Sequence, residues 1–95
     1  MKPVLHDATD ERLMTMLRAL ANSARLQIFN ELRRGEDRLC QDLVEGLPLS
    51  QSTVSEHLQR LRDAGLIKPE RAGALRKYVV DEEALAWLKE RVSTL

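Results

Sequence analysis

The sequence predicts a mainly α-helical domain that also contains a small β-hairpin. Apolar residues recur at helical spacing in several segments, polar residues suited to capping precede most of these segments, and two short strand-like runs flank Gly73. With 43% apolar and 32% charged residues in a chain of 95, we assign residues 1–95 to one folded domain rather than a disordered chain. Such a domain buries a small fraction of its surface, which favours a contribution from a partner subunit.

The first helix is expected over residues 10–21, with Asp7 or Thr9 as its cap. A helix that is apolar on more than one face is usually buried twice, here by its own domain and by a second subunit. The apolar residues that cover these faces are Leu13, Met14, Met16, Leu17 and Leu20.

The second helix is expected to start at a cap formed by Asn22 or Ser23 and to close with two arginines and Gly35. The residues expected to pack inward are Leu26, Ile28, Phe29 and Leu32. A short helix over about residues 38–46 follows, and Pro48 prevents it from continuing into the next segment.

Ser50 is the expected cap of a helix that runs to Ala64 and is stopped by Gly65. Its inner face is marked by apolar residues at i, i+4 and i+7, which are Val54, Leu58 and Leu61. Two helices, a short turn and a helix with a polar outer face form the helix-turn-helix pattern.

Residues 66–71 and 75–80 are expected to form a β-hairpin, the wing, in which Pro69 confines the first strand to an edge position. A last helix opens with three acidic residues at 81–83. It carries an apolar stripe that needs cover, and Trp87 beside this stripe is expected to fill a subunit interface. The stripe consists of Leu85, Leu88, Val92 and Leu95. The predicted fold is therefore a winged helix-turn-helix.

The polar start of the helix after Ser50 suits DNA binding. In helix-turn-helix complexes, these first turns contact base edges in the major groove, where Gln pairs well with adenine, and their free N–H groups suit a phosphate. Alternatively, Ser50 only caps an ordinary surface helix, and His57 is structural rather than a phosphate contact. The candidate DNA-binding residues here are Ser50, Gln51, Ser52, Thr53, Ser55, Glu56 and His57.

Basic residues follow this segment, although the formal net charge of the chain is zero. Arg71, Arg76 and Lys77 could reach the DNA backbone or the adjacent minor groove, or could protect a solvated sheet edge. Arg60 and Arg62 could contact flanking phosphates, or could simply keep the helix soluble. Residues 50–77 hold six basic side chains against three acidic ones, namely Arg60, Arg62, Lys68, Arg71, Arg76 and Lys77 against Glu56, Asp63 and Glu70.

Three segments resemble the ArsR family of winged-helix repressors: LANSARLQIF at 20–29, LSQSTVSEHL at 49–58 and LRDAGLI at 61–67. The resemblance spans about residues 10–92. It implies a homodimer joined through the first and last helices, with recognition helices in successive major grooves of a palindromic operator and repression relieved by an inducer.

The same resemblance implies that Gln51, Ser52 and Ser55 contact DNA, whereas Glu56 departs from the family pattern. An acid at that position could accept a hydrogen bond from cytosine or could weaken DNA binding.

The metal chemistry of the family is not expected in this chain. The family's Cys-x-Cys pair would fall on Leu39 and Gln41, and the last helix has no His for the family's other common metal site. One Cys and two distant His do not form a soft-metal site, so no metal and no cofactor are expected. Cys40 could be a redox switch, but its helical spacing favours a packed, small apolar side chain.

The sequence therefore predicts a sequence-specific, double-stranded DNA-binding transcriptional regulator acting as a homodimeric repressor. The alternative is a winged-helix module that binds a protein, which zero net charge and Glu56 favour. No nucleophile with a base, no glycine-rich phosphate loop and no paired carboxylates point to an enzyme. The absence of a membrane-spanning run or signal segment predicts a cytoplasmic protein.

Overall fold

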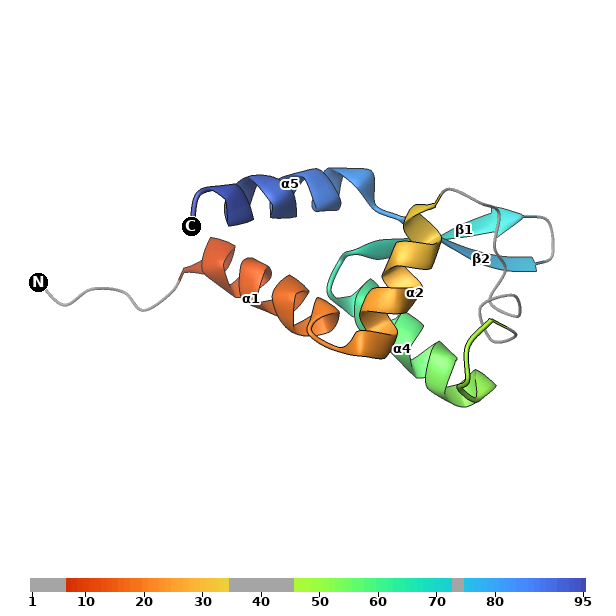
Figure 1. The fold of residues 1–95 in the computed structure, drawn as a ribbon. Helices are drawn as coiled ribbons and strands as arrows, with labels where there is room; N and C mark the ends of the chain where they lie inside the picture. Colours follow the sequence, from red (N-terminus) through yellow and green to blue (C-terminus); the bar gives the residue numbers. More distant parts are fainter. Residues whose placement is uncertain (1–6, 35–45, 73–74) are drawn as a thin grey trace, which may run out of the picture.

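The computed structural model describes residues 7–34, 46–72 and 75–95 (Figure 1). The helix expected over residues 38–46 falls almost wholly outside these ranges, as does Cys40. Along the described residues the elements are α1 (Ala8–Leu20), α2 (Ser23–Arg33), α4 (Gln51–Asp63), β1 (Ile67–Ala72), β2 (Leu75–Val80) and α5 (Glu82–Ser93).

A capping side chain precedes each described helix, as the sequence predicts. Of the alternatives for the first two helices, Asp7 and Asn22 are the caps. The Asp7 carboxylate accepts a hydrogen bond from the backbone N–H of Asp10 at 2.9 Å, which lets α1 begin at Ala8, two residues earlier than expected. The caps of α4 and α5 are Ser50 and Asp81.

Gly65 ends α4 and turns the chain toward the hairpin. Its φ of +79° is a left-handed conformation that favours glycine. The N–H of Gly65 donates to the carbonyl of Arg62 at 2.9 Å, and the N–H of Leu66 donates to the carbonyl of Leu61 at 3.0 Å. This pair of bonds is a Schellman motif, which satisfies carbonyls at the helix end and sets the direction in which β1 leaves α4.

The hairpin is antiparallel and pairs Ile67 with Val80 at its base and Ala72 with Leu75 at its tip. The first strand begins one residue later than expected because the N–H of Leu66 bonds to α4, while its carbonyl accepts from the N–H of Asp81. Pro69 is tolerated because each described strand pairs on one side only.

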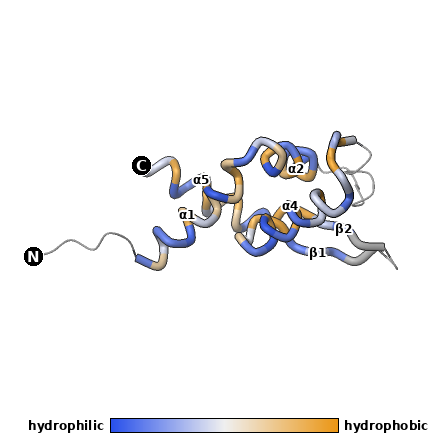
Figure 2. Tube along the Cα trace, turned by 90° about the horizontal axis from the view of Figure 1, so that it is seen from below, coloured by the Kyte–Doolittle hydropathy of each residue, from blue (hydrophilic) through white to orange (hydrophobic). Residues whose placement is uncertain are grey.

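The helices α1 and α5 lie side by side at one end of the molecule and run in opposite directions, while the hairpin lies at the other end (Figure 1). An ion pair of 3.2 Å between Asp10 and Arg91 joins the start of α1 to the end of α5. Figure 2 shows apolar and polar residues alternating along each of these helices, as expected for elements with one buried face.

The core is built from the inward faces of all described elements. Its largest fully buried side chains are Met16, Ile28, Val54, Leu58, Leu61 and Leu66. Among the described residues every buried side chain is apolar, so hydrophobic burial supplies the main packing energy.

The expectation that Leu26 packs inward is wrong, because this side chain is 43% exposed. Successive helical residues are rotated by about 100°, so Leu26 lies about 200° from Ile28, which is fully buried. Trp87 is half-buried against the core of its own protomer, and the guanidinium of Arg12 lies 4.1 Å from the centre of its ring.

Candidate nucleic-acid interface

The two faces of α4 differ in the way that the sequence predicts. Val54, Leu58 and Leu61 are buried in the core. The opposite face near the start of the helix consists of exposed polar residues, which are Gln51, Ser52, Ser55 and Glu56. These four residues are therefore open to a partner, and we refer to them below as the polar face of α4.

Hydroxyl groups form a small network at the start of α4. The Ser50 hydroxyl accepts from the backbone N–H of Thr53 at 3.2 Å and donates to the Thr53 hydroxyl at 2.8 Å. The Ser52 hydroxyl lies 3.1 Å from that of Ser50. Since the cap already engages Ser50 and Thr53, their first role is to shape the helix start. No acidic residue lies in the first turn of α4, so its positive dipole end is not opposed locally.

His57 lies at the margin between the two faces of α4 and is half-buried. Its Nδ1 is 3.4 Å from Nη1 of Arg25 on α2. The Arg25 side chain also donates from Nε to the carbonyl of Ala19 at 2.7 Å and from Nη2 to that of Arg18 at 3.5 Å. One guanidinium thus joins the end of α1, the start of α2 and the middle of α4.

Sequence reasoning did not assign a role to Arg25. A signal for it was present, because Arg25 stands three residues before Ile28 and four before Phe29. That spacing places it on the inward face of α2. A charged residue on an inward face requires polar partners.

Three of the four basic residues of the hairpin lie toward its loop end, whereas Lys68 pairs with Val79 near its base. Its register pairs Arg71 with Arg76 and Glu70 with Lys77. The Lys77 ammonium lies 3.5 Å from the Glu70 carboxylate, and the Lys77 side chain is only 14% exposed. Lys77 is therefore already engaged within the hairpin.

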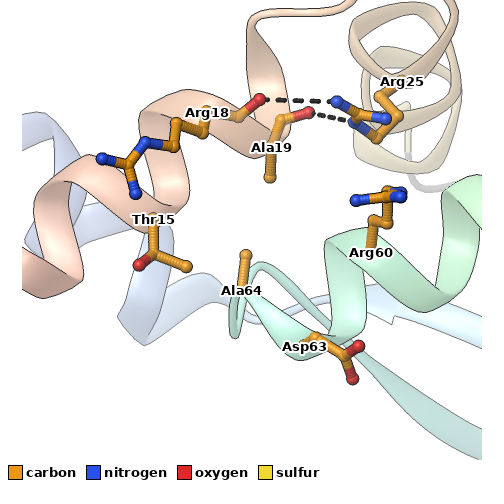
Figure 3. A pocket seen from close by; sticks show the side chains of 7 residues that line it. All are labelled: Thr15, Arg18, Ala19, Arg25, Arg60, Asp63 and Ala64. Atoms are coloured by element: carbon orange, nitrogen blue, oxygen red, sulfur yellow. Dashed lines mark hydrogen bonds between the residues drawn. The ribbon is translucent and has the colours of Figure 1, made fainter.

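Arg60 lies near the end of α4, one helical turn beyond Glu56. It lines a cavity of about 260 Å³ between α1, α2 and α4 (Figure 3). The prediction that Arg60 contacts a flanking phosphate stays a prediction. The other lining residues are Thr15, Arg18, Ala19, Arg25, Asp63 and Ala64.

Within the described ranges, no cluster of three or more His, Cys, Asp or Glu side chains is placed to hold a metal ion. In that same part of the chain, no helix is long and apolar enough to span a membrane.

Comparisons with known proteins agree with this arrangement. A sequence profile described as "Bacterial regulatory protein, arsR family" matches residues 22–68, which include α2 and α4. The arsenical resistance operon repressor of Bacillus subtilis (strain 168) is 42% identical over 77 residues, covering 79% of this chain and 72% of that protein. This chain belongs to the ArsR family.

Solved structures support the fold of this ArsR-family chain. An ArsR-like transcriptional regulator from Rhodococcus sp. RHA1 matches with a TM-score of 0.84 and 25% identity, covering 93% of this chain and 82% of the other. A homodimeric winged helix-turn-helix DNA-binding domain from Mycobacterium bovis, a possible ArsR-family regulator, matches with a TM-score of 0.73 and 23% identity, covering 98% and 90% of the two chains. The predicted winged helix-turn-helix fold is confirmed.

Proposed function

We propose that this ArsR-family protein is a homodimeric transcriptional repressor that binds an inverted-repeat operator in double-stranded DNA. The observation that carries the proposal is the polar face of α4, an exposed set of hydrogen-bonding side chains on a helix held rigidly by its buried opposite face. A helix of this kind fits the major groove, and its side chains provide direct contacts to base edges.

Each residue of the polar face has a distinct role in this proposal. The Gln51 amide pairs with adenine, and the hydroxyls of Ser52 and Ser55 bond to base edges. Glu56 accepts from the amino group of cytosine, which makes it a specificity residue rather than an affinity residue. Ser50 and Thr53 hold the helix start so that its free N–H groups face a phosphate.

The hairpin supplies contacts to the DNA backbone. Arg71 and Arg76, paired at its loop end, contact phosphates or the adjacent minor groove. Lys77 adds positive charge beside them but is held by Glu70. These contacts set the orientation of α4 in the groove and do not themselves select a sequence.

The subunits associate through α1 and α5 in this proposal. Both helices carry large apolar side chains that the protomer leaves exposed: Leu17 on α1 and Val92 on α5, at 40% and 42%. Leu95, just beyond α5, is 86% exposed. The Mycobacterium bovis domain with the same fold is a homodimer. A two-fold dimer places two α4 helices in successive major grooves, which matches an inverted repeat.

Repression in this proposal takes place in the cytoplasm, where bacterial DNA lies, and an inducer relieves it. Binding to the operator uses side-chain and backbone contacts and needs no metal ion or cofactor.

A matched pair of variants on α4 tests the proposal. Gln51→Ala should reduce discrimination between the selected operator and a single-base variant by about 1–3 kcal/mol, whereas Gln59→Ala, at the other end of α4, should leave it within about twofold. Gln59 is exposed and bonds to Asp63. Fluorescence anisotropy with both duplexes measures the ratio. If Gln51→Ala and the unchanged protein show the same ratio of affinities for the two duplexes, Gln51 does not contact a base.

A second candidate function is a winged-helix module that binds a protein through the same surface. Exposed Glu56 and the zero net charge of the chain favour it. DNA binding predicts that the double variant Arg71→Gln, Arg76→Gln lowers the slope of log affinity against log salt by about 1.8. If the surface binds a protein partner instead, neither the unchanged chain nor the double variant should bind the duplex.

A further inference from the structure

The cavity between α1, α2 and α4 lies at the opposite end of α4 from Gln51. The two ends of this helix, Gln51 and Asp63, are 12 residues apart, or about 18 Å along the axis at 1.5 Å per residue. The cavity measures about 260 Å³, slightly below the usual range for small-molecule pockets, about 300–1,000 Å³. It is also open to solvent, since four of its seven lining residues are exposed, so it can hold only a small polar group.

The charge of the lining is strongly one-sided. Arg18, Arg25 and Arg60 contribute three guanidinium groups and Asp63 one carboxylate, a surplus of two positive charges. The Asp63 carboxylate accepts a hydrogen bond from the Gln59 amide at 2.8 Å. Within the described residues, the side chains of Arg18 and Arg60 have no ion pair. Figure 3 shows Arg25 and Arg60 on one side of the cavity and the Arg18 guanidinium on the other, beside Thr15.

Arg25 is held in place before any ligand arrives. Its guanidinium has five N–H donors, of which three are directed at Ala19, Arg18 and His57. Two N–H groups remain for a ligand. Because the side chain is already ordered and half-buried, a ligand there loses less of its binding energy to ordering a flexible arginine.

Guanidinium groups that line one cavity repel one another, and an anion bound among them reduces this repulsion. Arginine also pairs with planar or tetrahedral oxyanions through parallel N–H bonds. From the cavity, its charge and the fixed Arg25, we infer that Arg25 and Arg60, with Arg18 opposite, form a binding site for a small oxyanion, such as the phosphate or carboxylate group of a metabolite. This site does not depend on the proposed function, since it is complete in the protomer without DNA.

The test uses the ¹⁵N-labelled full chain without DNA. Two-dimensional NMR spectra of the arginine Nε–Hε groups are recorded while sodium phosphate, and separately sodium succinate, replaces sodium chloride at constant ionic strength. We expect saturating shifts for Arg25 and Arg60 with at least one of the two anions. The exposed Arg33 on α2 should not respond. The comparison of the two anions distinguishes a phosphate site from a carboxylate site.

Two variants on α4 form a matched pair for the same titration. Arg60→Gln should weaken binding of whichever anion gives the saturating shifts by about two- to fivefold, the range for an exposed ion pair. Arg62→Gln should leave the affinity for that anion unchanged. Arg62 is exposed on the same helix and does not line the cavity. Asp63→Asn should strengthen binding, because it removes the opposing carboxylate.

Several outcomes would overturn the inference. One is a linear response shared by Arg25, Arg33 and Arg62, since this indicates non-specific ion association. Another is equal anion affinity in Arg60→Gln and Arg62→Gln. A third is the absence of a saturating response to either anion. If Arg60→Gln then also lowers the slope of log DNA affinity against log salt, Arg60 is assigned to the DNA backbone instead.

Discussion

Nη1 of Arg25 on α2 lies 3.4 Å from Nδ1 of His57 on α4. The same guanidinium bonds to the carbonyl of Ala19, at the end of α1. His57 therefore belongs to a connection between three helices, and the orientation of the polar face of α4 depends on a residue that lies outside it.

Replacing Arg25 should destabilise the fold more than replacing another arginine of α2. Arg25→Gln cannot reproduce the three contacts and leaves helix-terminal carbonyls without their partner, so we expect a loss of about 1–3 kcal/mol in the free energy of unfolding. Arg33→Gln, at an exposed position on the same helix, should change it by less than about 0.5 kcal/mol. Urea unfolding followed by circular dichroism measures both. Equal losses would show that the Arg25 contacts do not stabilise the protein.

The left-handed conformation of Gly65 makes a second prediction. Gly65→Ala should cost about 1–2 kcal/mol of stability, because an L-residue with a Cβ is strained at positive φ. Apart from its own residue and chain neighbours, a Cβ at this position would meet no atom within 4 Å, so the cost arises from the backbone and not from a clash. Gly65→Asn should cost less, since Asn tolerates this region better. If the thermal unfolding midpoint of Gly65→Asn lies below that of Gly65→Ala, the backbone explanation is wrong.

The exposed apolar residues of α1 and α5 lead to a prediction about assembly. Val92→Glu places a charge on the proposed subunit interface and should convert the dimer to a monomer that is still folded, because Val92 is 42% exposed in the protomer. Glu90→Lys, at an exposed position on the same helix that lies about 200° around the helix from Val92, serves as the control and should remain dimeric. Sedimentation equilibrium measures the mass. A dimeric Val92→Glu protein would place the interface elsewhere.

Local signals in the sequence predicted most of the fold. Polar caps such as Asn22 and Ser50, the glycine at 65 and the spacing of Val54, Leu58 and Leu61 depend on short-range hydrogen bonding and helical periodicity, and all have the expected places in the structure. The element bounds differ by one or two residues at α1 and β1, where the Asp7 cap and the bonds of Leu66 decide the ends.

Features that depend on contacts between distant segments were not predictable in this way. The partnership of Arg25 with His57 and the placement of Arg18, Arg25 and Arg60 around one cavity require the packing of three helices. Leu26 was assigned to the core from its apolar character alone, whereas the rotation of α2 places it at the surface. Within the protomer, the apolar stripe predicted at the end of the chain is buried at Leu85 and Leu88, whereas Val92 and Leu95 remain exposed.

The central claim is that the polar face of α4 and the hairpin bind a specific DNA operator. The most direct test selects duplexes from a randomised pool with the dimeric protein and compares the affinity of the enriched sequence with that of a scrambled one across a salt series. We predict an inverted repeat with half-sites about one helical turn apart, at least about a thousandfold preference over the scrambled duplex and a steep loss of affinity with salt. No enriched sequence, with weak binding that does not distinguish the two duplexes, would contradict the claim.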